Sequence, residues 1–281
     1  MSDEVVAILE NKRVNAEYYK LVFSSKKLSQ GVSPGQFLNI QIENHQGLLL
    51  RRPFSYYRVC GQRIEILYEI LGRGTALLAG KRRGSTLKVL GPLGRPFSQN
   101  MNGRKRILVA GGVGVPPLIF LAETAPLLSS PREWGRKKPP KASLAKGGVE
   151  EINSLVLLIG CKSKSEVLPR RELSKVKGEV RYATNNGSYG KKGFVTVLLH
   201  DILRKENPKS LFIQTCGPNV MMDAVMNIAK EFGVKGEASI DERMACGVGA
   251  CLGCVVETHE GFKTSCVEGP VFGFHELVKY V

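Results

Sequence analysis

Four of the seven cysteines in this 281-residue chain lie within 21 residues of one another, and their spacing constrains the fold more than any other feature. Cys246, Cys251 and Cys254 form a C-x4-C-x2-C loop, and Cys266 follows after eleven further residues. Three thiolates in one loop with a fourth at a distance is the ligand spacing of plant-type [2Fe–2S] clusters. The glycines between these cysteines let the backbone wrap closely and point N–H groups at sulfur. The sequence therefore predicts a [2Fe–2S] cluster held by these four thiolates.

A structural zinc site and a chance group of free thiols are the alternatives for this motif. Structural zinc sites usually pair two C-x2–4-C knuckles on separate hairpins. Here one such knuckle stands with a lone Cys266, which favours the cluster. The gap before Cys266 is shorter than we expect for plant ferredoxins. A zinc-stabilised binding module without enzymatic activity is kept as the distant alternative.

Both the N-terminus and the apolar runs argue against export or membrane insertion. The sequence MSDEVVAILENKR has no basic segment followed by an apolar run, so it predicts no signal peptide. The longest apolar runs, such as 155–160, are far too short to span a bilayer. We therefore expect a cytoplasmic protein without membrane association, in which cysteines seldom form disulfides. Cys60 and Cys161 are predicted to be small buried side chains, as free cysteines commonly are.

The net charge is strongly positive, because 41 Lys and Arg outnumber 25 Asp and Glu to give +16. Such a balance suits a nucleic-acid binder. The basic residues, however, are spread along the chain without interleaved aromatic residues, with one local excess at 132–146. Anionic cofactors or an acidic partner subunit explain the charge equally well, and we expect no nucleic-acid partner.

Residues 1–102 carry the pattern of an antiparallel β-barrel. Turns rich in Gly and Pro separate short β-type segments at 5–9, 19–23, 36–42, 63–70 and 86–90. Several short strands at nearly regular spacing are typical of a barrel or sandwich. No helical periodicity competes with this pattern before residue 100.

Residues 103–236 change to alternating strands and helices. Strands are predicted at 106–110, 155–160, 180–183 and 210–215, and helices through about 128, at 194–203 and at 221–232. The alternation predicts a doubly wound parallel sheet, whose ligand binds outside the carboxyl ends of the strands. Residues 129–150 are rich in Pro, Gly, Lys and Arg and indicate a solvated insertion, with partner docking as the alternative. The remaining residues, 237–281, form the cysteine region.

The R-P-F-S string at 52–55 and the later Gly74-Thr75 can together form an anion site. A proline-stiffened strand can present the Arg52 guanidinium to a pyrophosphate and the Ser55 hydroxyl to a flavin ring. Backbone N–H groups of Gly74 and Thr75 can reach the same phosphates. Taken alone, the string fits an exposed strand edge equally well.

Two further motifs lie at predicted strand ends of the α/β region. Gly111, Gly112 and Gly114 stand between a strand and a helix and resemble a dinucleotide loop, although Pro117 takes the place of the last glycine. Helix N-termini bind phosphate well in any case. Cys216 begins a Cys-Gly-Pro string at the carboxyl end of a strand, where α/β sheets meet their ligands. For Cys216, a functional role and buried packing are equally open.

The order of these motifs resembles the ferredoxin-reductase superfamily of flavoproteins, and more closely the electron-transfer subunits of NAD-linked (class 1B) dihydroorotate dehydrogenases. The likeness covers residues 48–273, through the strings LLLRRPFSYY, LGRGTALL, LGPLGRPF, AGGVGVPPL, NNGSYGKKGFVT, CGPNVMM, DERMACGVGACLGCVV and CVEGPVF. The cysteine-rich string is the most specific of them. The insertion at 129–150 departs from the family pattern, as does Asn185-Asn186, where an acidic residue is expected.

The resemblance implies three cofactors: FAD, a [2Fe–2S] cluster and NAD. Region 1–102 would be the FAD-binding barrel, with contacts from Arg52, Pro53, Phe54, Ser55, Leu67, Tyr68, Glu69, Gly74 and Thr75. Region 103–236 would bind NAD, and we place the nicotinamide cofactor near Gly111, Gly112, Gly114 and a catalytic Cys216. Region 237–281 would hold the cluster through Cys246, Cys251, Cys254 and Cys266.

The same resemblance implies a partner and a direction of electron flow. A separate FMN-containing catalytic subunit would oxidise dihydroorotate in pyrimidine biosynthesis, within a heterotetramer of two copies of each subunit. Electrons would then pass through the cluster and FAD to NAD+, because a flavin exchanges both single electrons and hydrides. Reductase subunits that serve a ferredoxin:NADP oxidoreductase or a sulfhydrogenase share these modules and are the nearest alternative.

Overall fold

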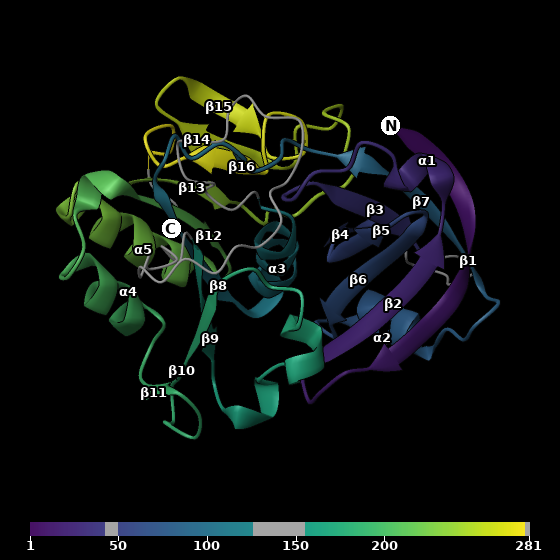
Figure 1. Ribbon diagram of the computed structural model, residues 1–281. Helices are drawn as coiled ribbons and strands as arrows, with labels where there is room; N and C mark the ends of the chain where they lie inside the picture. Colours follow the sequence, from purple (N-terminus) through teal and green to yellow (C-terminus); the bar gives the residue numbers. More distant parts are fainter. Residues whose placement is uncertain (43–49, 126–154, 279–281) are drawn as a thin grey trace, which may run out of the picture.

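Two seven-stranded sheets organise the chain in the computed structural model, which describes residues 1–42, 50–125 and 155–278 (Figure 1). The insertion predicted at 129–150 lies outside these residues. One sheet is antiparallel and the other is mainly parallel. The predicted combination of a barrel and an α/β sheet is therefore confirmed.

The first sheet is antiparallel and curved, in the order β4-β3-β7-β1-β2-β6-β5. Its strands alternate buried and solvent-facing residues, most clearly in β7, where Leu87, Val89 and Leu93 point into the core. Short apolar alternation punctuated by turns is what the sequence of this region shows. The strands are β1 (Ser2–Arg13), β2 (Tyr18–Ser24), β3 (Phe37–Gln41), β4 (Arg52–Ser55), β5 (Arg58–Cys60), β6 (Arg63–Glu69) and β7 (Thr86–Leu93).

Two helices interrupt this barrel, so the expectation of none before residue 100 was wrong. They are α1 (Lys26–Ser29) and α2 (Arg73–Gly80). The Ser25 hydroxyl accepts a hydrogen bond from the backbone N–H of Leu28 and begins α1. The Thr75 hydroxyl accepts from the N–H groups of Leu71 and Gly72 and holds the turn that leads into α2. Glycines at the start of α2 look like a turn in the sequence and hide the helix.

The second sheet has the order β11-β10-β9-β8-β12-β13-β16, and all its neighbours are parallel except β13 and β16. Leu108 and Ala110 face α3, whereas Ile107 and Val109 face α4 and α5, so both sides of the sheet are covered. The elements are β8 (Lys105–Gly111), α3 (Val115–Thr124), β9 (Leu155–Cys161), β10 (Glu179–Thr184), β11 (Lys191–Lys192), α4 (Thr196–Leu203), β12 (Leu211–Cys216), α5 (Asn219–Glu231), β13 (Lys235–Ser239) and β16 (Val271–Gly273).

The cysteine region lies across the ends of both sheets, at the top of the view in Figure 1. It contains the hairpin of β14 (Val255–Thr258) and β15 (Gly261–Thr264). β13 precedes the hairpin and β16 follows it. The two strands pair with each other in the mainly parallel sheet. Arg95, which follows β7, also bridges Pro270, so the region touches the barrel as well.

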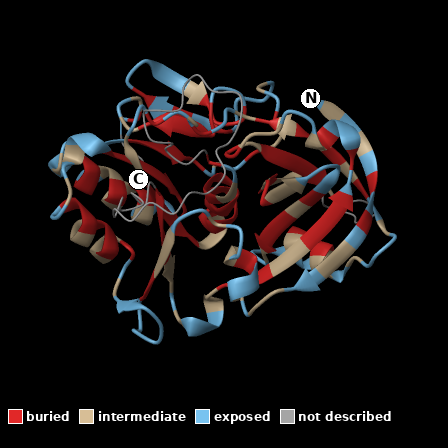
Figure 2. Cartoon of the chain, viewed as in Figure 1, coloured by how far each residue is buried: buried red, intermediate tan, exposed pale blue. Residues whose placement is uncertain are grey.

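Helix α3 joins the two sheets through apolar contacts. Its residues Val115–Ala122 are all buried, and it lies at the centre of the molecule (Figure 2). Phe120 packs into the barrel core, whereas Leu118 and Leu121 pack with β8 and β9. A helix that is apolar all round must be buried on all sides, and here the barrel supplies one of those sides. Among the described residues, no helix is long and apolar enough to cross a membrane.

A buried ion-pair network reinforces this junction. The Glu172 carboxylate, 3% exposed, accepts hydrogen bonds from Lys20 Nζ at 2.8 Å and Arg58 Nη1 at 3.0 Å. The Tyr57 hydroxyl lies 3.0 Å from the same carboxylate, and Arg58 Nε donates to Glu123 of α3 at 2.9 Å. Burial opposes ionisation of Glu172, but the hydrogen bonds and charge of its partners leave its pKa below the usual value.

Glu172→Ala should lower the free energy of unfolding by about 3 kcal/mol, because Lys20 would lose its buried ion pair while Arg58 would keep Glu123. Urea denaturation at pH 7 measures this. Asp201→Ala removes an exposed ion pair with Lys191 and should leave the midpoint unchanged.

The same network sets a pH dependence. The folded pKa of Glu172 lies below its ordinary value of 4.5, so its contribution is present above that pH and is lost as the pH falls. The stability difference between wild type and Glu172→Ala should therefore shrink in acid. Equal midpoints for the two proteins at pH 7 would contradict the role given to Glu172.

Candidate functional site

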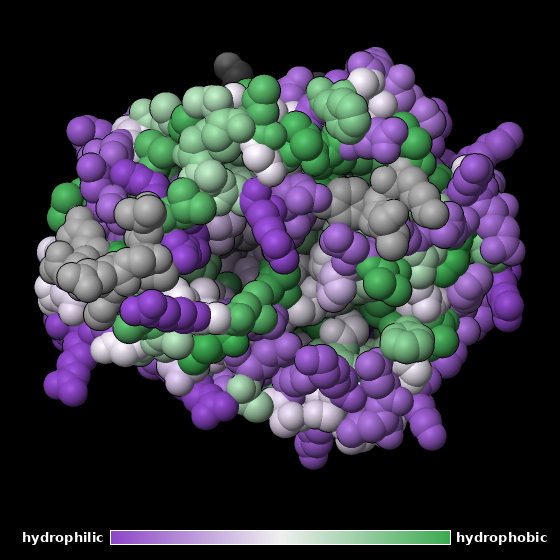
Figure 3. All heavy atoms as spheres, turned by 180° about the vertical axis from the view of Figure 1, so that it is seen from behind, coloured by the Kyte–Doolittle hydropathy of each residue, from purple (hydrophilic) through white to green (hydrophobic). Residues whose placement is uncertain are grey.

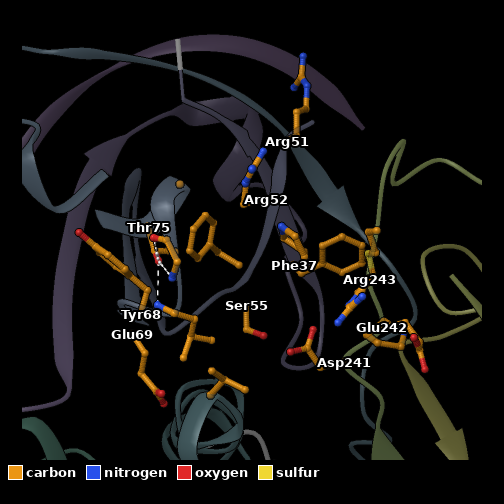
Figure 4. A pocket seen from close by; sticks show the side chains of 18 of the residues that line it. Phe37, Arg51, Arg52, Ser55, Tyr68, Glu69, Thr75, Asp241, Glu242 and Arg243 are labelled. Atoms are coloured by element: carbon orange, nitrogen blue, oxygen red, sulfur yellow. Dashed lines mark hydrogen bonds between the residues drawn. The ribbon is translucent and has the colours of Figure 1, made fainter. Parts of the chain in front are cut away.

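A cavity of about 550 Å³ lies between the barrel and the carboxyl ends of the parallel strands (Figure 4). β4, β6 and the start of α2 form its barrel side, and the segment after β13 forms the opposite side. The structure brings together on its wall all nine residues predicted to contact FAD: Arg52, Pro53, Phe54, Ser55, Leu67, Tyr68, Glu69, Gly74 and Thr75.

The Arg52 side chain crosses the start of α2. β4 pairs with β3, which places Arg52 opposite Ile40 and Ser55 opposite Phe37. A Cβ on Gly74 would lie 2.7 Å from Arg52 Nε, which is a steric clash. Glycine at position 74 therefore leaves the space that the guanidinium occupies at the cavity wall.

Hydrogen bonds fix the aromatic wall of the cavity. The buried Tyr68 donates its hydroxyl proton to Asn11 Oδ1 at 3.0 Å, and Asn11 Nδ2 donates to the Leu78 carbonyl near the end of α2 at 2.7 Å. The rings of Tyr68 and Phe54 meet edge to face, with centroids 5.8 Å apart. The cavity thus has a rigid apolar side with a guanidinium at its rim.

The glycine-rich turn after β8 approaches the cavity through Val113, since none of its three glycines is on the wall. A Cβ on Gly114 would lie 2.1 Å from the Cys216 backbone, so Gly114 is needed for close packing of two strand ends. Gly112 has φ +48° and lies near Glu69. The structure therefore gives Gly114 a packing role, which the sequence alone does not show.

Cys216 is buried at the end of β12 and lines the cavity. Burial, together with the Asp241 charge, raises the pKa of its thiol to about 12, against a hydrogen bond with Ser239 that lowers it. The thiol is thus protonated at neutral pH. Cys216 is therefore packed, as one alternative predicts, and it also borders the cavity, while its functional role stays a prediction.

Sequence reasoning missed the residues that immediately precede the cysteine loop. Asp241, Arg243 and Met244 line the cavity opposite β4, and Figure 4 shows Asp241 and Arg243 on that side. Burial raises the pKa of Asp241, and the neighbouring charge of Glu242 raises it further. All three residues belong to the DERMAC string, which the sequence links only to the cluster.

The four predicted ligand cysteines come together in two pairs. Cys251 lies close enough to Cys246 to lower its pKa, and Cys254 lies close enough to Cys266 to raise the pKa of that thiol. The backbone N–H of Val248 donates to Cys246 Sγ at 3.4 Å, which lowers the Cys246 pKa to about 6. Burial and the Cys254 contact raise the pKa of Cys266 to about 11, although Gly249 N–H donates to its sulfur at 3.2 Å.

This arrangement fits two metal atoms better than one. A single zinc ion needs four ligands at about 2.0–2.3 Å from a common centre. Within the described ranges, no set of three His, Cys, Asp or Glu side chains is gathered closely enough to hold one ion. Two pairs of thiols with backbone N–H groups pointing at sulfur match a [2Fe–2S] cluster, in which each iron takes two thiolates.

Two side chains, Phe37 and Met244, connect the cysteines to the cavity. Phe37 packs in an apolar cluster with Cys254 and Cys266, and it also lines the cavity beside Ser55 (Figure 4). The backbone carbonyl of Cys246 lies 3.5 Å from Asn39 Nδ2 on the same strand, β3. The cysteine loop and the cavity are therefore neighbours across β3.

The other two cysteines are not as predicted. Cys60 is exposed at the end of β5, and Cys161 is only half-buried at the end of β9. The expectation that both are buried was wrong, although Cys216, which also stands at a strand end, is buried.

Comparison with known proteins bears directly on these features. A model of the iron–sulfur cluster binding domain of dihydroorotate dehydrogenase B matches residues 241–278. Over the whole chain, the dihydroorotate dehydrogenase B (NAD(+)) electron transfer subunit of Geobacillus sp. (strain WCH70) is 34% identical over 285 residues, with 99% of both chains covered. The chain belongs to this family of electron transfer subunits. The subunit of the same name from Fusobacterium nucleatum is 32% identical, with 97% of each covered.

Two solved structures share the fold of this chain. A NADH-dependent reduced ferredoxin-NADP oxidoreductase has a TM-score of 0.77 at 24% identity, with 97% of this chain and 89% of that chain covered. A ferredoxin NADP+ reductase from Neisseria gonorrhoeae with bound FAD and NADP gives 0.61 at 16% identity, with 83% and 92% covered. The predicted ferredoxin-reductase-like fold is confirmed.

In the cluster-free chain at pH 7, iodoacetamide should alkylate Cys246 at least about tenfold faster than Cys216 or Cys266, since the thiolate is the reactive form. The Cys246 pKa of about 6 leaves it mostly ionised, whereas that of Cys216 is about 12. Peptide mass spectrometry over time measures the three rates. Equal rates would contradict the N–H contacts described for the Cys246 sulfur.

Proposed function

We propose that this chain carries electrons from the catalytic subunit of dihydroorotate dehydrogenase to NAD+, through a [2Fe–2S] cluster and FAD. The observation that carries the proposal is that Phe37 and Met244 pack against Cys254 and Cys266 and also line the cavity. A bound FAD exchanges both single electrons and hydrides, the chemistry needed between a one-electron cluster and NAD+. The family membership supports this choice over the related reductases and over a zinc-stabilised module.

The barrel side of the cavity suits FAD. In this proposal Arg52 donates to the pyrophosphate, and N–H groups of Gly74 and Thr75 reach the same phosphates. Ser55 meets the flavin ring, and Pro53 and Phe54 support it. Further contacts come from the wall formed by Leu67, Tyr68 and Glu69. The space left by Gly74 beside Arg52 supports the fit, since a side chain there would displace the guanidinium.

The α/β side suits the nicotinamide cofactor. Ligands of doubly wound sheets bind beyond the carboxyl ends of the strands, which here carry Gly111, Gly112 and Cys216. Gly114 permits the close approach of these ends. We assign Cys216 as a catalytic residue whose neutral thiol borders the reacting ring. Accordingly, residues 1–102 are the FAD-binding domain, 103–236 the NAD-binding domain and 237–281 the cluster-binding region, with Cys246, Cys251, Cys254 and Cys266 as ligands.

The partner is an FMN-containing dihydroorotate dehydrogenase catalytic subunit, in a complex of two copies of each chain. The β14–β15 hairpin and the cysteine loop supply the docking surface, because Leu252 and Phe262 are 65% and 74% exposed there. Hydrophobic side chains gather at several places along the upper part of the molecule (Figure 3). Docking here would bring the cluster close to the partner. We place the complex in the cytoplasm, where the three cysteines that do not hold the cluster would remain thiols.

Arg52→Ala should weaken FAD binding by about tenfold or more, because each charge-assisted hydrogen bond contributes about 1.5–3 kcal/mol. Fluorescence titration of the FAD-free chain measures the dissociation constant. Arg63→Ala, at an exposed site on β6 away from the cavity, is the matched control. Unchanged affinity in Arg52→Ala, or tighter binding of FMN than of FAD, would count against this assignment.

Cys254→Ser should remove the cluster and abolish dihydroorotate:NAD+ transfer in the complex with the catalytic subunit. NADH oxidation should persist with an acceptor that takes electrons directly from FAD. Iron and acid-labile sulfide assays should give about two of each per wild-type chain and none in the variant. Cys60→Ser, remote from the cluster loop, is the control.

Two results would refute this division of labour. One is full coupled activity in a Cys254→Ser complex that lacks the cluster. The other is oxidation of dihydroorotate by the isolated chain, for which we assign no substrate site here.

A further inference from the structure

A second cavity, of about 520 Å³, adjoins the cofactor cavity at the junction of the two sheets. The two share Glu69 and Leu71 on their walls. Its other side is formed by Glu17, which precedes β2, and by Glu166, which follows β9. Three carboxylates from three separate segments therefore line a space that borders the cofactor cavity.

The loops that carry two of these carboxylates are clamped to each other by Asn15. Its Oδ1 accepts hydrogen bonds from the N–H groups of Glu17 at 3.0 Å and Tyr18 at 2.7 Å. Its Nδ2 donates to the backbone carbonyl of Glu166 at 2.8 Å. The barrel loop and the loop after β9 are thus fixed relative to one another, and the facing of Glu17 and Glu166 is built into the fold.

Glu69 stands at the boundary between the two cavities. Its Oε1 is shielded from solvent and accepts no hydrogen bond from the described residues. The Tyr18 hydroxyl lies beside this carboxylate but donates its proton to the Gly112 carbonyl at 2.8 Å. A shielded carboxylate oxygen without a donor is costly when ionised and is relieved when it takes up a proton.

The charges around the second cavity favour holding a proton near neutral pH. Burial and the charges of Glu69 and Glu166 together raise the pKa of Glu17 to about 7, against the opposing charge of Lys162. Burial also raises the pKa of Glu69. Arg13 lines the same cavity, and Cys161, whose own pKa is raised, lies close to Glu17 and Glu166.

The proposed electron path leaves a proton unaccounted for. An iron–sulfur cluster delivers electrons without protons, whereas NAD+ accepts a hydride, which is two electrons and one proton. Each NAD+ that is reduced therefore requires one proton from outside the cofactor cavity. In the reverse direction, when one-electron acceptors oxidise NADH, one proton is released inside that cavity. A bound cofactor would cover the cavity, so the proton needs a route through the protein.

We propose that Glu69 passes this proton between the cofactor cavity and the second cavity, where Glu17 and Glu166 exchange it with solvent. The proposal rests on the proposed function, because it assigns the proton that this electron transfer requires. Asp241, which faces Ser55 across the cofactor cavity, is the competing carboxylate (Figure 4). The experiment has to separate the two.

The test is single-turnover NADH oxidation by the FAD- and cluster-loaded chain in lightly buffered solution, with a pH indicator reporting the proton. Without an acceptor, flavin bleaching measures hydride transfer. With a one-electron acceptor, the indicator measures proton release. Glu69→Gln should slow proton release by at least about tenfold. A positioned proton-transfer group typically contributes roughly 100- to 10,000-fold, so tenfold is a lower limit. Because Glu69 also lines the FAD cavity, hydride transfer and FAD occupancy are measured in the same variant, and each should fall by a smaller factor than proton release, since a hydride carries its own proton. Glu17→Gln, which lies outside that cavity, should leave hydride transfer and FAD occupancy unchanged.

Two further variants sharpen the result. In wild type, proton release should accelerate as the pH rises through about 7, because Glu17 accepts a proton only when ionised. This pH dependence should disappear in Glu17→Gln. Glu231→Gln, at the exposed end of α5, is the matched control and should behave as wild type.

Three results would overturn the proton route. One is unchanged proton release in Glu69→Gln. The second is a loss of release in Asp241→Asn with Glu69→Gln unaffected. The third is an equal slowing of hydride transfer and proton release in Glu69→Gln, which would limit the role of Glu69 to cofactor binding. If NADH does not bleach the flavin of the wild-type chain, the proposed function itself is refuted.

Discussion

The contact between the barrel and the α/β sheet is the constraint on which the rest of the structure depends. Helix α3 fills it with apolar side chains, and Glu172 ties Lys20 and Arg58 of the barrel to the opposite side. Both cavities lie along this junction, and neither sheet alone has the residues to form them. A small rotation at the junction would separate Glu69 from Glu166 and Ser55 from Asp241, so the geometry of the cofactor site depends on an interface made of structural residues.

Local patterns were predictable from the sequence, because their physical causes are local. The spacing of Cys246, Cys251 and Cys254 directly indicates a ligand loop. Apolar runs bounded by turns predict most strands of both sheets. Helix α2 was missed because Gly72 and Gly74 mimic a turn while Thr75 holds the helix start. β13 was missed because its buried Gly236-Glu237 does not look like a strand interior, yet Glu237 is paired with Ser98 and Gln214.

The candidate site was predictable only where one segment carries its motif. The residues around Arg52 and Gly74 were identified through a family resemblance, and the structure places them on one cavity wall. The facing of Glu17, Glu69 and Glu166 could not be seen, because it depends on Asn15 joining loops about 150 residues apart. Phe37 was likewise hidden, since nothing in the sequence links β3 to cysteines more than 200 residues later.

The pairing of β16 with β13 has a consequence for damage and repair. The cysteine region leaves the parallel sheet after Ser239 and returns to it at Val271, so both of its ends are fastened to one sheet edge. Closing a loop of this size costs little entropy beyond that of a shorter one. If oxidants strip the cluster, its thiols stay tethered over the same small area of surface. Reinsertion of iron and sulfide is then a local event, which a damaged molecule can undergo without refolding.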